Sequence, residues 1–330
     1  MSWSGKRVLV TGAGGFIGSH LAERLAAEGA KVRAFVHYNA RGDWGNLEHL
    51  PEAVRNALEV VAGDIRDPFH LRRAAEGCEA VFHLAALIAI PFSYESPLSY
   101  VETNVRGTLN LLQACLDARV PRIVCTSTSE VYGTAQTVPI REDHPLVGQS
   151  PYAASKIGAD QMAIAFHRSF QAPVVLLRPF NTYGPRQSLR AVIPTIIAQA
   201  LSPAGGEVRL GSTAPTRDFT FVTDTVDAFL KAAEASGALG QVIQTGTGRE
   251  VSVGDLAQII LKRAGSGALL AQDPLRVRPA ASEVERLVAD ASKARAVLGW
   301  EPKVGLEEGL DRTIAWFRAS APKRPERYVR

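Results

Sequence analysis

The chain has 330 residues, of which 46% are hydrophobic and 21% are charged, and its formal net charge is +4 at pH 7. These proportions exclude a fibrous or disordered chain and fit about two domains, or one α/β unit with an appended lobe. The longest apolar stretch, 80–92, contains a histidine and falls short of the roughly 18 residues that a membrane span needs. We therefore expect neither a membrane nor a nucleic-acid partner.

The segment MSWSGKRVLVTG contains no apolar core of the kind found in secretion signals, so we expect a cytoplasmic protein. The three cysteines, Cys78, Cys115 and Cys125, lie in apolar stretches and lack the spacing of metal-binding motifs. This pattern predicts buried free thiols in a reducing compartment and no metal site.

Strands and helices alternate through the first 180 residues. A helical period at 16–29 ends at Gly29, and similar patterns separate the later strands. Apolar, β-branched runs predict strands at 7–12, 31–36, 58–64, 80–86, 122–128 and 172–180. Such alternation implies βαβ crossovers, so we predict an α/β fold with a Rossmann-type doubly wound parallel sheet.

Turn-rich segments break this rhythm after Phe180, and the shorter elements that follow end in a predicted helix at 306–319. We interpret this part as a smaller C-terminal α/β lobe that binds substrate. The predicted dinucleotide-binding domain comprises 1–180 and about 219–250, and the predicted lobe comprises 181–218 and 251–330.

The stretch TGAGGFIG places Gly12, Gly15 and Gly18 between the first predicted strand and the first predicted helix. Glycines there permit a tight turn, let backbone N–H groups approach a pyrophosphate, and allow the helix to pack closely on the strand. Their spacing is G-x-x-G-x-x-G, because Ile17 takes the place of a glycine in G-x-G-x-x-G. We predict that this loop binds a dinucleotide.

The second predicted strand lacks the acidic residue that commonly holds the adenosine ribose. Val36 stands at the expected position, and no arginine follows it directly. His37 or Arg41 could meet the 2′-phosphate of NADP. The sequence leaves NAD and NADP open, with a slight preference for NAD.

The stretch SPYAASK places Tyr152 and Lys156 one helical turn apart on one face. A tyrosine near pKa 10 is a poor base at neutral pH, and we expect an adjacent ammonium to lower that pKa. The stretch CTSTSEVYG adds Thr128, Ser129 and Glu130 at the end of the fifth predicted strand. Together with the glycine loop, these residues predict proton transfer beside a dinucleotide.

On these motifs the chain resembles an extended short-chain dehydrogenase/reductase, of the family of NAD-dependent nucleotide-sugar epimerases, dehydratases and decarboxylases. The likeness runs nearly from end to end, through VTGAGGFIG, AGDIRD, VFHLAA, NVRGTLNLL, STSEVYG, SPYAASK, LRPFNTYGPRQ, RDFTFVTDTVDA and LGWEP. It implies an enzyme that keeps its dinucleotide tightly bound, acts on a nucleotide sugar and forms a homodimer.

The resemblance also implies roles for individual residues. Tyr152 would be the catalytic acid and base, Lys156 its partner, Thr128 the family's Ser/Thr, and Asn104 would help to position the active-site helix. The implied cofactor contacts are Gly12, Gly15, Phe16, Ile17, Gly18, His37, Asp64, Ile65, Leu84, Ala85, Ala86, Asn104, Tyr152 and Lys156. The implied substrate contacts are Ser93, Asn181, Arg186, Arg217, Arg276 and Arg278, among which cationic side chains suit a diphosphate.

Ser129 and Glu130 bear on the reaction. Sugar 4,6-dehydratases and the decarboxylases that make UDP-pentoses are similar to this chain in having Ser-Glu here, whereas galactose-type 4-epimerases usually have small or neutral groups. Longer stretches, such as HLAALIAIPFSYESP, TSTSEVYGTAQ, PFNTYGPRQSLRAVIPTII and RPAASEVERL, resemble 4,6-dehydratases of the legionaminic-acid type. The resemblance implies conversion of a nucleotide hexose, UDP- or GDP-N-acetylglucosamine, to its 4-keto-6-deoxy form through transient oxidation at carbon 4.

Three alternatives stay open. A 4-epimerase is disfavoured by Glu130, and a UDP-glucuronate decarboxylase needs a carboxylate pocket that the sequence does not reveal. A non-catalytic, cofactor-sensing scaffold typically loses Tyr or Lys from the pair that this chain retains as Tyr152 and Lys156. The nucleotide base and the sugar are not determined by the sequence.

Overall fold

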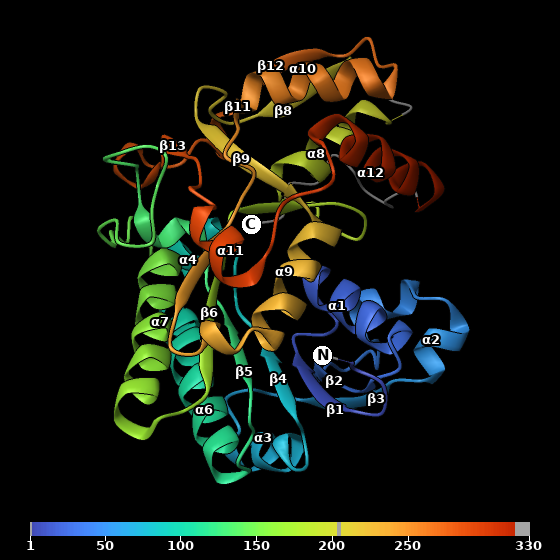
Figure 1. Cartoon of the computed structure of the whole chain (residues 1–330). Coiled ribbons are helices and arrows are strands. Elements are labelled where there is room, and N and C mark those ends of the chain that lie inside the picture. Colours follow the sequence, from blue (N-terminus) through green and yellow to red (C-terminus); the bar gives the residue numbers. More distant parts are fainter. Residues whose placement is uncertain (1, 203–205, 321–330) are drawn as a thin grey trace.

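The computed structural model describes residues 2–202 and 206–320. Within them, seven strands form one parallel sheet in the order β3-β2-β1-β4-β5-β6-β10 (Figure 1). The strands are β1 (Arg7–Thr11), β2 (Lys31–His37), β3 (Glu59–Gly63), β4 (Ala80–His83), β5 (Ile123–Thr126), β6 (Val174–Pro179) and β10 (Val242–Thr245). The predicted Rossmann-type sheet is confirmed, and its winding reverses between β1 and β4, where ligands bind in such folds.

Helices cover both faces of this sheet because side chains alternate along each strand. Leu9 of β1 belongs to a core shared with α3 (Pro68–Ala75), α6 (Gly107–Asp117) and α7 (Pro151–Phe170). Val8 and Val10 point the other way, into a core shared with α1 (Phe16–Ala27), α9 (Val222–Glu234) and α11 (Ser292–Leu298). Cys78, Cys115 and Cys125 are all buried and free in the first of these cores, as predicted.

A smaller group of elements lies beyond the carboxyl ends of the strands, at the top of Figure 1. Its central strand β9 (Thr216–Phe221) pairs with β7 (Asn181–Tyr183), β11 (Glu250–Ser252) and β13 (Arg286–Leu287), while β8 (Glu207–Leu210) pairs with β12 (Leu269–Gln272). The helices here are α8 (Val192–Ala200), α10 (Val253–Ala264) and α12 (Leu306–Ser320). The predicted helix at 306–319 is therefore present, and the last ten residues of the predicted lobe lie outside the described residues.

Short helices connect β4 to α6 and β5 to α7. After β4 come α4 (Ile90–Glu95), α5 (Pro97–Tyr100) and a π-helical turn, η2 (Val101–Arg106). After β5 comes a 3-10 turn, η3 (Ser129–Tyr132). The side chain of Ser150 caps α7 by accepting a hydrogen bond from the backbone N–H of Ala153 at 3.1 Å, so Pro151 and Tyr152 begin the helix.

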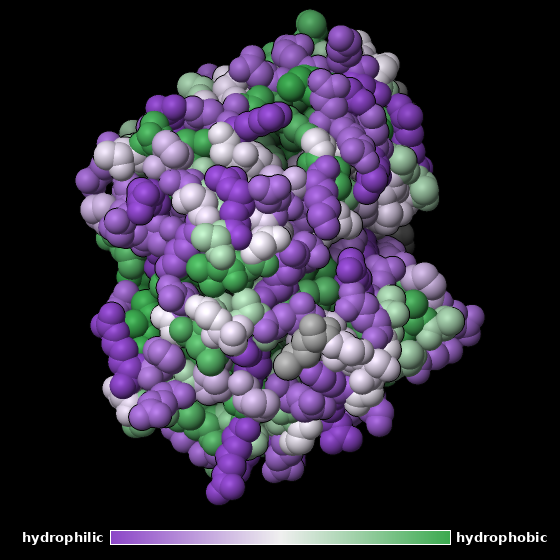
Figure 2. All heavy atoms as spheres, viewed as in Figure 1, coloured by the Kyte–Doolittle hydropathy of each residue, from purple (hydrophilic) through white to green (hydrophobic). Residues whose placement is uncertain are grey.

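The surface of the described chain is mixed in character. On the face drawn in Figure 2, hydrophilic side chains lie over both groups of elements, and hydrophobic ones are scattered between them in small patches. None of the helices in the described ranges is long and apolar enough to cross a membrane.

Candidate active site

The loop after β1 has no room for side chains. A Cβ on Gly12 would lie 2.7 Å from the backbone nitrogen of Ala85, and one on Gly18 would overlap the carbonyl oxygen of Gly12. Gly12 also has a φ of +71°, which favours glycine. The helix α1 begins directly afterwards, and no side chain caps its N-terminus. An uncapped helix N-terminus behind a tight glycine loop fits the diphosphate of a dinucleotide.

The segment after β4 lies against this loop across the crevice. The backbone N–H groups of Leu84 and Ala85 donate to the carbonyl oxygen and the hydroxyl of Thr11, at 3.2 and 3.3 Å. His83 lies behind them, with its ring nitrogens 2.8 Å from the Thr11 hydroxyl and 3.0 Å from the Thr108 hydroxyl. Burial, with a smaller contribution from the charge of Lys156, lowers the pKa of His83 to about 3, so its ring is neutral.

The end of β2 contributes no carboxylate of its own. Val36 is buried, and its Cγ1 would lie 3.5 Å from a Cβ on Gly14, so an apolar side chain backs the glycine loop. His37 is exposed near Asp64, whose pKa is lowered mainly by hydrogen bonds from Arg66 and slightly by the charge of His37. The predicted adenosine contacts His37 and Asp64 therefore come together at one edge of the sheet.

Ile65 is buried beside them, and its Cδ1 would lie 2.6 Å from a Cβ on Gly107. Arg41, the other candidate for a 2′-phosphate, is 84% exposed in its side chain and pairs with Asp43 at 3.0 Å. Phe16 opens α1 and packs edge-on against His20, with the ring centroids 5.8 Å apart.

Tyr152 is buried in the first turn of α7, with the side chain of Thr128 near its hydroxyl. The ring of Tyr100 packs edge-on against it, with the centroids 6.2 Å apart. Burial raises the pKa of Tyr152 well above its ordinary value, and the charge of Glu130 raises it further. The expected lowering of this pKa is wrong for this structure, because desolvation dominates and the Nζ of Lys156 donates to the Thr126 carbonyl at 2.6 Å.

Glu130 lies between the catalytic helix and the lobe. It belongs to η3, where its backbone N–H donates to the Thr128 hydroxyl at 3.2 Å, and its charge acts on both Tyr152 and Arg217. Its side chain is partly exposed, whereas the neighbouring Ser129 is buried. The structure thus brings the carboxylate of Glu130, the hydroxyl of Thr128 and Tyr152 to one place.

Asn104 joins the segment after β4 to α7. Its side chain accepts a hydrogen bond from the Leu87 N–H at 2.8 Å and donates to the Leu87 carbonyl and the Ser155 hydroxyl, each at 2.9 Å. Ser155 lies between Tyr152 and Lys156 in sequence. The contact therefore ties the crevice loop directly to the catalytic helix.

Two of the predicted substrate arginines meet across the lobe. Arg217 is buried, and its Nη2 lies 3.5 Å from Oε1 of Glu283, while Nη1 of Arg278 lies 3.4 Å from the same oxygen. Burial lowers the pKa of Arg217. The side-chain oxygen of Asn181 is buried without a hydrogen-bond partner, which leaves it available to a ligand.

The remaining predicted substrate residues lie elsewhere or are engaged. Arg276 pairs with Asp273 at 3.0 Å, and the Ser93 hydroxyl donates to the Ile90 carbonyl at 2.6 Å within α4. Arg186 lies against α1, where its Nη2 is 2.6 Å from Glu23 and its Nε donates to His20 at 3.2 Å. The structure does not bring Arg186 to Arg217 and Arg278.

A buried polar network next to the site was missed by the sequence interpretation. Asp160 accepts hydrogen bonds from Ser127 at 2.6 Å and from Arg178 at 3.0 and 3.1 Å. Arg178 also donates to the hydroxyl of Tyr132 at 3.0 Å. The spacing of Asp160, four residues after Lys156 on a predicted helix, could have indicated this neighbour.

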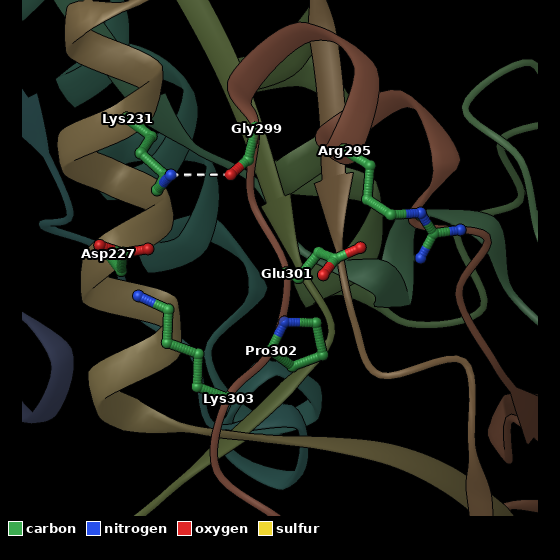
Figure 3. Close-up of a pocket in the computed structure, with 7 residues that line it drawn as sticks. All are labelled: Asp227, Lys231, Arg295, Gly299, Glu301, Pro302 and Lys303. Carbon is green, nitrogen blue, oxygen red and sulfur yellow. Dashed lines mark hydrogen bonds between the residues drawn. The ribbon is translucent and has the colours of Figure 1, made fainter.

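A separate surface pocket of about 300 Å³ lies between α9 and the segment after α11 (Figure 3). Lys231 donates to the Gly299 carbonyl at 2.7 Å, and the nearby Asp224 accepts from the backbone of Lys303 and Val304, each at 2.9 Å. These contacts fasten the LGWEP stretch to α9. None of the predicted catalytic or substrate residues lines this pocket.

Comparisons with known proteins agree with this geometry. The family model described as GDP-mannose 4,6 dehydratase matches residues 9–313. The chain is 37% identical over 318 residues to a protein of Mycolicibacterium smegmatis named UDP-glucose 4-epimerase, covering 94% of this chain and 98% of that protein. It is 34% identical to an Actinoplanes protein named dTDP-glucose 4,6-dehydratase, covering 95% and 98%. Relatives named as decarboxylases are 32% identical.

Among solved structures, the chain is similar to DesIV, a dTDP-glucose 4,6-dehydratase of Streptomyces venezuelae determined with NAD bound. The two are 33% identical with a TM-score of 0.83, and the match covers 96% of this chain and 98% of that one. Similarity at this level extends over both the parallel sheet and the smaller group of elements.

Proposed function

The chain belongs to the NAD-dependent epimerase/dehydratase family of extended short-chain dehydrogenase/reductases, whose members act on nucleotide sugars, and we propose that it is a 4,6-dehydratase within that family. The observation that carries this proposal is Glu130, which lies two residues after Thr128 and whose charge acts on Tyr152. A reaction that only oxidises and re-reduces carbon 4 needs no carboxylate there. Removal of a proton from carbon 5 does.

The residues of the crevice fit an NAD-type cofactor. The glycine loop and the N-terminus of α1 would hold the diphosphate, and the segment after β4 would line the opposite side. When bound, the cofactor would accept a hydride from carbon 4 and later return it to the sugar, so no net oxidation occurs. We propose NAD in slight preference to NADP, because Arg41 is already paired with Asp43.

The protein's own groups would move the protons. Tyr152 would take the proton of the 4-hydroxyl, with Thr128 beside it. Oxidation at carbon 4 acidifies the proton on carbon 5, which Glu130 would remove. The hydroxyl of carbon 6 would then leave as water, protonated by Glu130 with assistance from Ser129. When the hydride returns to carbon 6, the proton held by Tyr152 would pass to carbon 5, so that one water is lost and no net oxidation occurs.

Arg217 and Arg278 would bind the diphosphate of the substrate. They share one carboxylate oxygen at long distances, so both have donors left for a ligand. The unpartnered side-chain oxygen of Asn181 is an acceptor, and it would accept a hydrogen bond from an O–H or N–H group of the nucleotide sugar. We propose UDP- or GDP-N-acetylglucosamine as the substrate, on the resemblance of the longer stretches to dehydratases that act on such sugars.

We also propose a homodimer through the helices that follow β4. Leu98, Val101 and Leu109 are 69%, 49% and 39% exposed and follow one another through α5, η2 and α6. Exposed apolar side chains that gather along connected helices favour association with a second copy. Sedimentation of the purified protein tests this, and a monomer at micromolar concentration would contradict it.

Mass spectrometry tests the reaction directly. The purified protein is incubated with UDP-, GDP-, CDP- and dTDP-hexoses, with and without a 2-acetamido group. A product lighter by one water, formed without added cofactor, supports the dehydratase. Loss of carbon dioxide from a uronic acid would assign a decarboxylase instead, and an unchanged mass with inverted stereochemistry an epimerase.

Denaturing the protein and identifying the released dinucleotide decides between NAD and NADP.

A further inference from the structure

A carboxylate with one unpartnered oxygen is buried one helical turn beyond the catalytic lysine. Asp160 is 1% exposed, and its Oδ2 accepts all three hydrogen bonds, one from Ser127 and two from Arg178. Its Oδ1 is buried and has no hydrogen-bond partner. An oxygen left bare in the interior is costly unless nearby positive charge compensates for it.

Lys156 is the second positive charge beside that carboxylate. It is 6% exposed, and the two side chains stand four residues apart on α7, so they share one face of the helix. The Nζ of Lys156 donates to the Thr126 carbonyl, on the strand β5 that leads to Ser127. Burial lowers the pKa of Lys156, and the charge of Asp160 opposes that lowering.

Arg178 interacts with Tyr132 as well as with Asp160. It donates to the hydroxyl of Tyr132 at 3.0 Å and lies 5.1 Å from the centre of that ring. The same hydroxyl donates to Gln244 at 2.8 Å. Two buried cations, Lys156 and Arg178, therefore flank one buried carboxylate, and Arg178 receives additional stabilisation from Tyr132.

We propose that Asp160 is a positioning residue of the active site: fixed by Ser127 and Arg178, its carboxylate keeps the buried Lys156 protonated beside Tyr152. This rests on the proposed function only in that Tyr152 and Lys156 carry the proton transfer at carbon 4, which the family's reactions share. Among the described residues, the other titratable groups that interact with Tyr152, Lys156 or Asp160 are His83 on β4, Cys125 on β5, Glu130 and Tyr132 in η3, Tyr100 in α5 and Arg178 on β6.

Asp160 differs from those neighbours in supplying negative charge to the lysine. The pKa of His83 is lowered to about 3 and that of Cys125 is raised to about 12, both mainly by burial, so both are neutral near pH 7. The charge of Glu130 acts on Tyr152 and Arg217. Lys156 thus depends on Asp160 for its counter-charge.

A double-mutant cycle tests the pairing without any substrate. Urea unfolding of the dinucleotide-loaded protein is measured for wild type, Asp160→Asn, Lys156→Met and the double variant. Asp160→Asn should cost much less stability in the Lys156→Met background, with a coupling of roughly tenfold in the unfolding equilibrium constant. Additive effects would show that Asp160 serves Arg178 alone and would overturn the proposal. Glu308→Gln, which breaks the exposed pair with Arg312, is the matched control. Its effect on the free energy of unfolding should add to that of Lys156→Met.

Asp160→Asn alone could be insoluble while the double variant with Lys156→Met is soluble. That outcome would also show coupling between the two residues. Should Asp160→Asn prevent folding in both backgrounds, the cycle is run with Asp160→Glu, which keeps the charge but displaces it, and additivity again contradicts the proposal.

The pH profile gives a second readout. In Asp160→Asn, the alkaline limb of turnover should move to lower pH by about one unit, because Lys156 loses its proton more easily. Asp160→Glu, which keeps the charge but displaces it, should move the limb in the same direction by less. If Asp160→Asn lowered turnover but left both the acid and the alkaline limb of the pH profile in place, the role of Asp160 would be purely structural. If no sugar nucleotide is turned over, the proposed function fails, while the stability cycle still decides this proposal.

Discussion

The catalytic side chains on the parallel sheet and the arginines of the smaller lobe are held in different ways. Around β5 and α7, polar groups are buried and joined by hydrogen bonds of 2.6 to 3.1 Å, as in the network from Ser127 through Asp160 to Arg178. In the lobe, Arg217 and Arg278 share a single oxygen of Glu283 at 3.5 and 3.4 Å. In the proposed reaction the sheet would therefore supply preorganised groups for proton transfer, whereas the lobe would supply cations that are held loosely enough to turn to a ligand.

Removing the hydroxyl of Tyr152 should give the largest effect. Tyr152→Phe keeps the ring packed against Tyr100 but cannot take the proton of the 4-hydroxyl, so turnover should fall by roughly 10²–10⁴-fold or more. Product formation is followed by mass spectrometry. An unchanged unfolding midpoint and retained dinucleotide would show that the variant is folded, and wild-type turnover would refute the assignment of Tyr152.

Removing the charge of Glu130 should separate the two chemical stages. Glu130→Gln should still oxidise carbon 4, so the near-ultraviolet band of reduced nicotinamide should build up on addition of substrate. Loss of water should slow by roughly 10²–10⁴-fold, because the amide cannot accept the proton of carbon 5. Glu207→Gln, which removes the exposed pair with Arg209 on β8, is the control. Normal dehydration by Glu130→Gln would remove the main residue-level support for a dehydratase.

Substitutions in the lobe should change affinity more than rate. Arg217→Met should weaken substrate binding by roughly tenfold to a hundredfold, because a charge-assisted hydrogen bond to a diphosphate is lost. Arg278→Met should have a smaller effect, since the Arg278 side chain is 28% exposed against 8% for Arg217. Calorimetric titration with the substrate measures both. A loss of turnover at saturating substrate as large as the loss of affinity would show that the lobe also contributes to the chemical step.

The same contrast explains what the sequence could predict. The strands from β1 to β6 were predicted because each is a short apolar run bounded by turns, and Tyr152 and Lys156 lie one helical turn apart. The seventh strand, β10, pairs with β6, from which it is distant in sequence, and no local pattern indicates this pairing. No local pattern indicates the cluster of Arg217, Arg278 and Glu283 either, because its members come from distant segments. The pKa of Tyr152 was predicted in the wrong direction because spacing shows which groups are near but not how deeply they are buried.

The smallest effect concerns two histidines with a lowered pKa, the buried His83 on β4 and the partly buried His20 on α1. His83 lies on the sheet beneath the crevice, and burial lowers its pKa to about 3; His20 lies against Arg186, and burial followed by that charge lowers its pKa to about 4. In the unfolded chain both would bind a proton below about pH 6.5. Unfolding therefore takes up protons below pH 6.5. As the pH decreases below 6.5, the free energy of unfolding should fall by about 1.4 kcal/mol per pH unit for each histidine.

Above pH 6.5 neither histidine contributes a slope, because both are neutral in the folded and unfolded chains. Between pH 6.5 and about 4 both contribute, and below that His20 is protonated in the folded chain too, so only His83 continues down to about pH 3. Urea unfolding at pH 7, 6 and 5 measures the slope, and His83→Asn should reduce it by about one proton. An unchanged slope in His83→Asn would mean that the folded protein already protonates this ring near pH 6. The preorganisation inferred for the sheet would then be weaker than its burial implies.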